Sequence, residues 1–242
     1  MKIIADTHTH TIMSGHAHST VMENIKVARE KGLKFIAVTD HTKLMPDCPG
    51  DVYFSCMRSA LPDEYDGVYI LRGCEANIID ENGTVDISDK ALDLLEWRIA
   101  SIHSLLTKPM GFENHTKLWT NIAKNPRIDV IGHSGEEDFK YDYERVMQEF
   151  KKYGKIVEIN ASSAKSRPTC IDNCTEIARL CAKYGVPIVI SSDAHFASRI
   201  GEFAKGIEIV TNAGVPEELI LNADAQRFAT FLENKLGRKF EV

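Results

Sequence analysis

The sequence has no long hydrophobic run and no excess of positive charge. Its first apolar stretch begins at Ile3 and stops at Asp6, far short of a signal-peptide core of about 7–15 residues or a membrane-spanning helix of about 20. The chain carries 29 Lys and Arg against 35 Asp and Glu, a net charge of −6. General nucleic-acid binding needs a basic face. We therefore expect a cytoplasmic protein that binds neither membrane nor nucleic acid.

Cys-x-x-Cys pairs are also missing from the sequence. Cys174 and Cys181 lie seven residues apart on one face of a predicted helix. We expect all the cysteines to be small buried hydrophobes in a reducing compartment. The six are Cys48, Cys56, Cys74, Cys170, Cys174 and Cys181.

No internal repeat, low-complexity tract or linker divides the chain, and Met45 to Gly50 is expected to be a loop at the rim of the fold. The 242 residues are close to the roughly 250 that are typical of a closed α/β barrel. A composition of 43% hydrophobic and 26% charged residues is ordinary for a globular protein. We expect a single domain that spans residues 1–242.

Short apolar runs alternate with amphipathic stretches. The runs predict seven strands, at Ile3 to Ala5, Phe35 to Val38, Val68 to Leu71, Arg98 to Ile102, Val130 to Ile131, Ile156 to Ile159 and Pro187 to Ile190. The amphipathic stretches predict helices at Val21 to Lys31, Thr116 to Lys124, Tyr143 to Tyr153 and Glu176 to Tyr184. Thr20 and Glu23 have the spacing of a capping box, and Asn173 is a candidate N-cap of the last helix. This alternation favours a parallel sheet that is covered by helices.

Polar residues of the kinds found in active sites follow the predicted strands. An open sheet would spread them across its width, whereas a barrel brings all its strand ends to one mouth, where parallel α/β barrels carry their active sites. We therefore favour a closed α/β barrel. These residues are His8, His10, His41, Glu75, His103, His133, Asn160, Asp193 and His195.

The strand-end residues indicate a metal site. His8 and His10 are two residues apart on a strand, so their side chains point to the same side and can hold one ion. A catalytic zinc takes three protein ligands and a water, so nine candidates suit two or three ions. Taken alone, His18 and His115 predict no ligand, and we place His115 on the surface of a helix start. The nine candidates are His8, His10, His16, His41, Glu75, His103, His133, Asp193 and His195.

The motifs also carry a resemblance to a known family. They are Asp-x-His-x-His near the N-terminus, Thr-Asp-His41, Gly-Cys-Glu75-Ala, Ile-His103, Gly-His133, Glu-Ile-Asn160 and Ser-Ser-Asp193-Ala-His195. In this order and spacing the chain resembles the PHP (polymerase and histidinol phosphatase) family, and within it the YcdX-type phosphatases. The resemblance covers residues 3 to about 235.

This resemblance implies a distorted TIM-like (β/α)7 barrel with three metal ions at its mouth. Carried over to this sequence, one ion would be held by His8, His10, Glu75 and Asp193, a second by the bridging Glu75 with His103 and His133, and a third by His16, His41 and His195. Zinc is expected, about three per chain, with manganese or iron as alternatives. Two segments depart from the family pattern, Ser104 to Leu106 and Gly132 to Gly135. They remove no ligand, but the family pattern does not define the shape of the rim there, and therefore does not define the substrate.

The expected activity is hydrolysis of a small phosphomonoester by a metal-activated hydroxide, because bound zinc lowers the pKa of water toward about 7. Arg167 and Ser162 are the candidate phosphate contacts, while Lys165 is expected to be a solvated loop charge. Asp40 would either orient a metal-binding histidine or cap its strand end.

Three other functions stay open at this stage. They are hydrolysis of histidinol phosphate, a nuclease-like activity on phosphodiesters, and metal binding without catalysis. The acidic chain disfavours the nuclease. Nine ligands over three ions leave open positions for water and substrate, which disfavours a purely structural metal site. The sequence does not decide between a monomer and a homo-oligomer.

Overall fold

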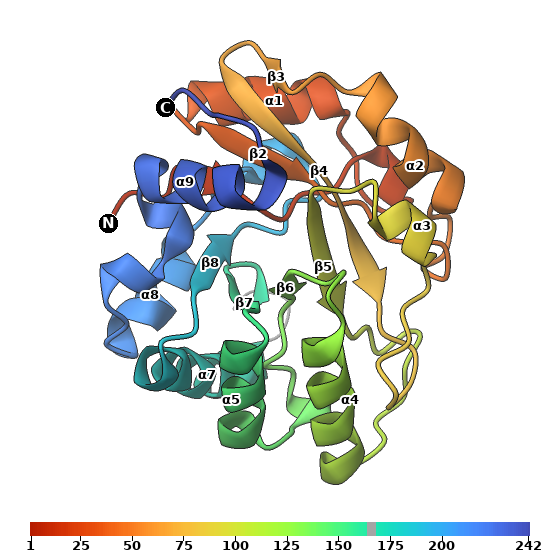
Figure 1. Cartoon of the computed structure of the whole chain (residues 1–242), viewed down its shortest axis with the longest axis vertical. Coiled ribbons are helices and arrows are strands. Elements are labelled where there is room, and N and C mark those ends of the chain that lie inside the picture. Colours follow the sequence, from red (N-terminus) through yellow and green to blue (C-terminus); the bar gives the residue numbers. More distant parts are fainter. Residues whose placement is uncertain (164–167) are drawn as a thin grey trace.

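The computed structural model describes residues 1–163 and 168–242, which form a parallel barrel surrounded by helices (Figure 1). The barrel strands follow the order β1-β2-β4-β5-β6-β7-β8, and all of these neighbours are parallel. This confirms the predicted seven-stranded TIM-like barrel. The strands are β1 (Ala5–Asp6), β2 (Phe35–Val38), β4 (Val68–Asn77), β5 (Trp97–Ser101), β6 (Val130–Ile131), β7 (Ile156–Asn160) and β8 (Ile188–Ser191).

The predicted helices are all present, with shifted ends. The capping box of α1 is confirmed, since Thr20 and Glu23 bond each other's backbone. The predicted N-cap at Asn173 is wrong: α7 begins two residues earlier, and the Asn173 side chain donates to the Gly135 carbonyl at 3.0 Å. The helices are α1 (Val21–Glu30), α2 (Asp51–Ala60), α3 (Asp89–Leu92), α4 (Phe112–Lys124), α5 (Tyr143–Lys152), α7 (Ile171–Tyr184), α8 (Ala204–Asn212) and α9 (Ala225–Leu236).

Several elements were not predicted from the sequence. They are α2, α3, α8, α9 and the short strand β3 (Glu64–Tyr65). β3 pairs antiparallel with β4 through a two-residue turn in which Asp66 and Gly67 both have positive φ. An Asp-Gly pair favours this turn because both positions must adopt left-handed backbone angles.

The hydrophobic core has two parts. One is a cluster of strand residues, including Phe35 and Trp97, that packs against Phe228 and Leu232 of α9. The other packs side chains of the strands against those of the surrounding helices. Because α9 packs against the first cluster, the C-terminal part of the chain belongs to the barrel core.

The seam between β1 and β8 is closed by side chains together with a backbone bridge, in which the His10 amide donates to the Ala194 carbonyl at 2.9 Å. Asn222 donates from Nδ2 to the carbonyls of Ala5 at 2.9 Å and Ile190 at 2.7 Å, and its Oδ1 accepts from the Ile190 amide at 3.1 Å. Nearer the mouth, the Asp6 carboxylate accepts from the amide of Ser192 at 3.0 Å and from its hydroxyl at 2.5 Å. These contacts fix the two strands that precede the predicted N-terminal and C-terminal metal ligands.

The cysteine prediction is only partly right. Cys74, Cys170, Cys174 and Cys181 are buried, but Cys56 is exposed and Cys48 is partly exposed. Both of these lie in or near α2, where the sequence analysis recognised no helix. Among the residues described, no helix is long and apolar enough to cross a membrane.

Candidate metal centre

The nine predicted ligands all lie at the carboxyl end of the barrel. His41 and His103 follow β2 and β5, and Asp193 follows β8, whereas Glu75 lies within β4, which continues to Asn77. Seven of the nine line one cavity of about 860 Å³; the two others, His8 and His10, are fully buried. The structure therefore brings the predicted residues together at one mouth.

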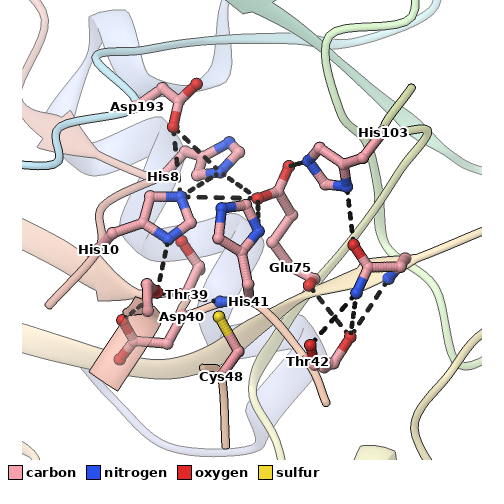
Figure 2. A network of polar contacts seen from close by, with 12 residues as sticks. His8, His10, Thr39, Asp40, His41, Thr42, Cys48, Glu75, His103 and Asp193 are labelled. Carbon is pink, nitrogen blue, oxygen red and sulfur yellow. Dashed lines mark hydrogen bonds and ion pairs between the residues drawn. The ribbon is translucent and has the colours of Figure 1, made fainter. Parts of the chain in front are cut away.

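The Glu75 carboxylate is at the centre of this cluster. Its side chain is 1% exposed, and Figure 2 shows imidazoles directed at it from several strands. Each oxygen faces more than one ring nitrogen. Oε2 lies 2.8 Å from His41 Nδ1, 3.3 Å from His8 Nε2 and 3.5 Å from His10 Nε2, and Oε1 lies 2.9 Å from His133 Nε2 and 3.3 Å from His103 Nε2.

Asp193 and His195 extend the cluster toward the outside. Asp193 Oδ1 lies 3.2 Å from His10 Nε2, and His195 Nε2 lies 3.0 Å from His16 Nε2. Three overlapping groups of described residues have ligand atoms within 4.8 Å of one another and could each hold an ion. They are His8, His10 and Glu75; His41, Glu75 and His103; and His10, His41 and His195.

The chemistry of the cluster fits bound cations. His41 Nδ1 and Glu75 Oε2 are buried and lie 2.8 Å apart, but their geometry is not that of a hydrogen bond, and neither atom has a hydrogen-bond partner among the described residues. Such an arrangement is costly unless another partner is supplied. Burial, and then the charges of His195 and His41, lower the pKa of His10 well below its usual value. The neutral imidazole that results is the form that binds metals. Burial acts to raise the pKa of Glu75, but neighbouring charges, first that of His8, hold this pKa well below its usual value.

Asp40 supports a histidine through one intervening side chain. Its Oδ1 accepts from the Ser14 hydroxyl at 2.6 Å, and Ser14 Oγ lies 3.0 Å from His10 Nδ1. Asp40 also accepts from the Thr11 amide at 2.7 Å and from the Tyr53 hydroxyl at 2.7 Å. It therefore makes contacts of both predicted kinds, one toward a site histidine and one that caps local backbone.

Two further supporting residues were missed by the sequence analysis. Asn77 Oδ1 lies 2.7 Å from His103 Nδ1, and Asp86 accepts from the Asn77 amide at 2.9 Å. Glu158 Oε1 lies 2.6 Å from His8 Nδ1. The available signal for Glu158 was a lone acid inside the apolar run of β7, because such a residue is buried only with partners.

Asn160, predicted as a strand-end site residue, links the site to the loop that follows β7. Its Nδ2 donates to Asp193 Oδ2 at 3.1 Å, and its Oδ1 accepts from the amide of Ser162 at 2.9 Å. Ser162 lines the cavity. The predicted phosphate contact Arg167, and Lys165 with it, lie outside the described residues.

The prediction that His115 lies on the surface is wrong. Its side chain is buried in α4, with 2% of the residue exposed. Its Nε2 accepts from the Met110 amide at 2.9 Å, and its Nδ1 lies 2.9 Å from the Lys140 carbonyl. Helix periodicity alone could not show this, because both partners belong to loops.

We expect His115→Ala to lower stability without changing the metal centre. The change leaves the Met110 amide and the Lys140 carbonyl unpaired, at a cost of about 1–3 kcal/mol each. Denaturant unfolding should show the loss, while metal content per folded chain should match the unmodified protein. A selective loss of metal would show that His115 supports the site.

Sequence profiles place the chain in a family. The PHP domain profile matches residues 6–162, and a PHP-associated profile matches residues 172–230. The chain belongs to the PHP family. A probable phosphatase of Thermoanaerobacter sp. strain X514 is 42% identical to this PHP protein over 237 residues, which cover 97% of this chain and 96% of the relative. A probable phosphatase of Acetivibrio thermocellus is 39% identical over 238 residues, 98% of each chain.

A solved structure shares the barrel of this PHP protein. The histidinol phosphate phosphatase of Lactococcus lactis, solved with zinc, L-histidinol and phosphate, has a TM-score of 0.65 at 14% identity, over 89% of this chain and 95% of that one. At this identity the likeness shows the fold alone. Family membership and the near full-length relatives confirm the predicted enzyme class, a hydrolase acting on phosphate esters.

Proposed function

We propose that this PHP protein is a metal-dependent phosphatase that hydrolyses a small phosphomonoester. The observation that carries the proposal is the buried cluster of imidazoles around Glu75, in which His41 Nδ1 and Glu75 Oε2 lie 2.8 Å apart without the geometry of a hydrogen bond. The cluster adjoins a cavity of about 860 Å³, within the range of about 300–1,000 Å³ usual for small-molecule sites.

The nine candidate ligands would hold more than one ion. Two of the three overlapping groups share Glu75 and two share His41, which supports a bridged cluster. We propose that it holds the three ions that the family resemblance implies. Zinc is our first choice, with manganese or iron as alternatives. When bound, such ions lower the pKa of water toward about 7 and neutralise phosphate oxygens.

Cationic side chains also line the same cavity. Arg199 and Lys205 both contribute to its lining, as does Ser162. Arg199 Nη1 lies 3.1 Å from Glu202 Oε2, and about half of its side chain is exposed. A guanidinium in this position could bind phosphate oxygens, so Arg199 joins Arg167 and Ser162 as a proposed substrate contact.

We also propose that the two profile-matched segments act as one domain. β7 lies in the first segment and β8 follows in the second, yet their backbones pair from Val157 with Ile188 to Asn160 with Ser191. The candidate ligands come from both segments. Neither segment alone would complete the site.

We expect simple aryl phosphates to be hydrolysed at least about tenfold more efficiently than aryl diesters, a difference of about 1.4 kcal/mol in transition-state stabilisation. A terminal phosphate carries one more negative charge than a diester, and clustered cations favour that charge. Comparing kcat/KM for p-nitrophenyl phosphate and bis(p-nitrophenyl) phosphate on one metal-loaded preparation provides the measurement. A preference for the diester would favour the nuclease-like alternative.

Histidinol phosphate remains the second candidate substrate, because an acidic cavity adjoins the site. This cavity has a volume of about 740 Å³ and shares His16 and His103 with the first. Asp47, Glu137 and Asp138 contribute to its lining, and carboxylates attract an amine-bearing leaving group. Including histidinol phosphate in the same comparison tests this, since a large preference for it would identify the substrate.

A further inference from the structure

Glu158 is a buried acid in the middle of β7, and it has no place among the nine candidate ligands. Its side chain is 1% exposed. Burying a carboxylate is unfavourable unless hydrogen bonds or opposite charges compensate it. The partners of its two oxygens therefore indicate what this residue does.

Four donors from four parts of the barrel converge on the Glu158 carboxylate. Oε1 receives His8 Nδ1 at 2.6 Å and the Ser191 hydroxyl. Oε2 accepts from the His133 amide at 2.8 Å and from Asn160 Nδ2 at 3.3 Å. An ionised carboxylate has about four acceptor positions and no donor, so this set of partners is complete only when Glu158 carries its negative charge.

The contact with His8 determines which ring nitrogen can face the metal site. Because Oε1 only accepts, His8 in the neutral form that binds a metal must carry its proton on Nδ1, which leaves the lone pair on Nε2. Nε2 lies 3.3 Å from Glu75 Oε2 and 3.6 Å from Asp193 Oδ1. The nitrogen freed in this way is therefore the one that points into the cluster.

The contact with His133 acts on the backbone. His133 has a φ of 21°, a value that side-chain-bearing residues rarely adopt and that must be held by the surroundings. The bond from its amide to Glu158 Oε2 supplies such a restraint. The His133 side chain reaches Glu75 Oε1 at 2.9 Å, whereas His8 faces Oε2, so Glu158 steadies two candidate ligands that face different oxygens of Glu75.

We propose that Glu158 is a positioning residue that fixes the tautomer of His8 and the backbone of His133 for metal binding. This role rests on the proposed metal site. Glutamine in its place would fail in either orientation. An amide NH2 turned toward His8 would favour the wrong tautomer, and one turned toward His133 would oppose both that amide and Asn160 Nδ2.

The test is Glu158→Gln, with Asp129→Asn as the matched control. The Asp129 carboxylate is also largely covered, with 10% of its side chain exposed, and it receives several donors, from Arg98 at 2.8 Å and Lys235 at 2.7 Å. It precedes β6, however, at the opposite end of the barrel. We expect Glu158→Gln to weaken zinc binding about 10- to 100-fold. Competition with a chromogenic chelator measures this affinity. Asp129→Asn should lower the unfolding temperature but change zinc affinity by less than about twofold. Asp129 lies far from the candidate ligands, and zinc affinity depends on the residues that hydrogen-bond to the ligands.

A second measurement does not depend on the variant folding. In the zinc-loaded unmodified protein, nitrogen NMR of the histidine rings should find His8 protonated on Nδ1. Protonation of His8 on Nε2, or unchanged zinc affinity in folded Glu158→Gln, would overturn the role of Glu158 alone. If the unmodified protein bound no metal under any condition, the proposed metal site would fail as well.

Discussion

Prolonged chelation is expected to abolish phosphatase activity, and added zinc or manganese is expected to restore it. The residues around Glu75 supply ligands and charge but, in our proposal, no nucleophile. Charge stabilisation by metal ions is worth several kcal/mol, so the loss should reach a factor of about 1,000 or more. Turnover of an aryl phosphate, measured before chelation, after it and after each metal is returned, provides the test.

Metal content of the purified protein is the companion measurement. Elemental analysis should give more than one ion per chain, because the group of His8 and His10 and the group of His41 and His103 share only Glu75. A single equivalent would reduce the three-ion proposal to one site and leave His16 without a role. Full turnover in rigorously metal-free protein would contradict the mechanism itself.

Glu75→Ala is expected to be the most damaging single substitution. The carboxylate lies within 3.5 Å of ring nitrogens from five histidines. Its removal would deprive two ions of a shared ligand and leave the surrounding imidazoles without the carboxylate that they face. We expect activity to fall by more than about 100-fold, the upper end of what the loss of a supporting partner costs, together with a lower metal content.

Glu144→Ala is the control for this substitution. Glu144 is an exposed glutamate of α5 that pairs with Lys183 and Tyr184 on the outside of the barrel. Exposed ion pairs contribute little to stability, so this variant should keep its metal and its turnover. If Glu75→Ala behaved in the same way, the bridging role of Glu75 would have to be abandoned.

Local pattern was enough to predict the barrel and the positions of the candidate ligands. Phe35 to Val38 and Val130 to Ile131 were predicted with the bounds that the structure has, because both strands are short, apolar and buried on both faces. The ligand candidates follow from the same pattern, since chemistry in such barrels is confined to the ends of strands.

Features that depend on partners distant in sequence could not be predicted. β4 continues beyond Leu71 because Arg72 is buried with Glu96 at 2.9 Å and Asp63 at 2.6 Å. Gly73 follows, and a Cβ there would lie only 2.3 Å from the Trp97 carbonyl. Locally, an arginine and a glycine look like the end of a strand. Glu158 was missed for the same reason, since three of its four donors, His8, His133 and Ser191, lie outside β7.

The seam between β1 and β8 also dictates the order in which the protein can become active during its synthesis. Ala5 and Asn222 are 217 residues apart, and Asp6 and Ser192 are 186 apart. At about 5–20 residues per second, a ribosome makes β1 roughly 10–40 s before it reaches Asn222. Contacts of such long range form late in folding. Ions that need ligands from both edges of the seam can therefore be captured only after the ribosome has made β8 and Asn222, long after His8 and His10 have emerged.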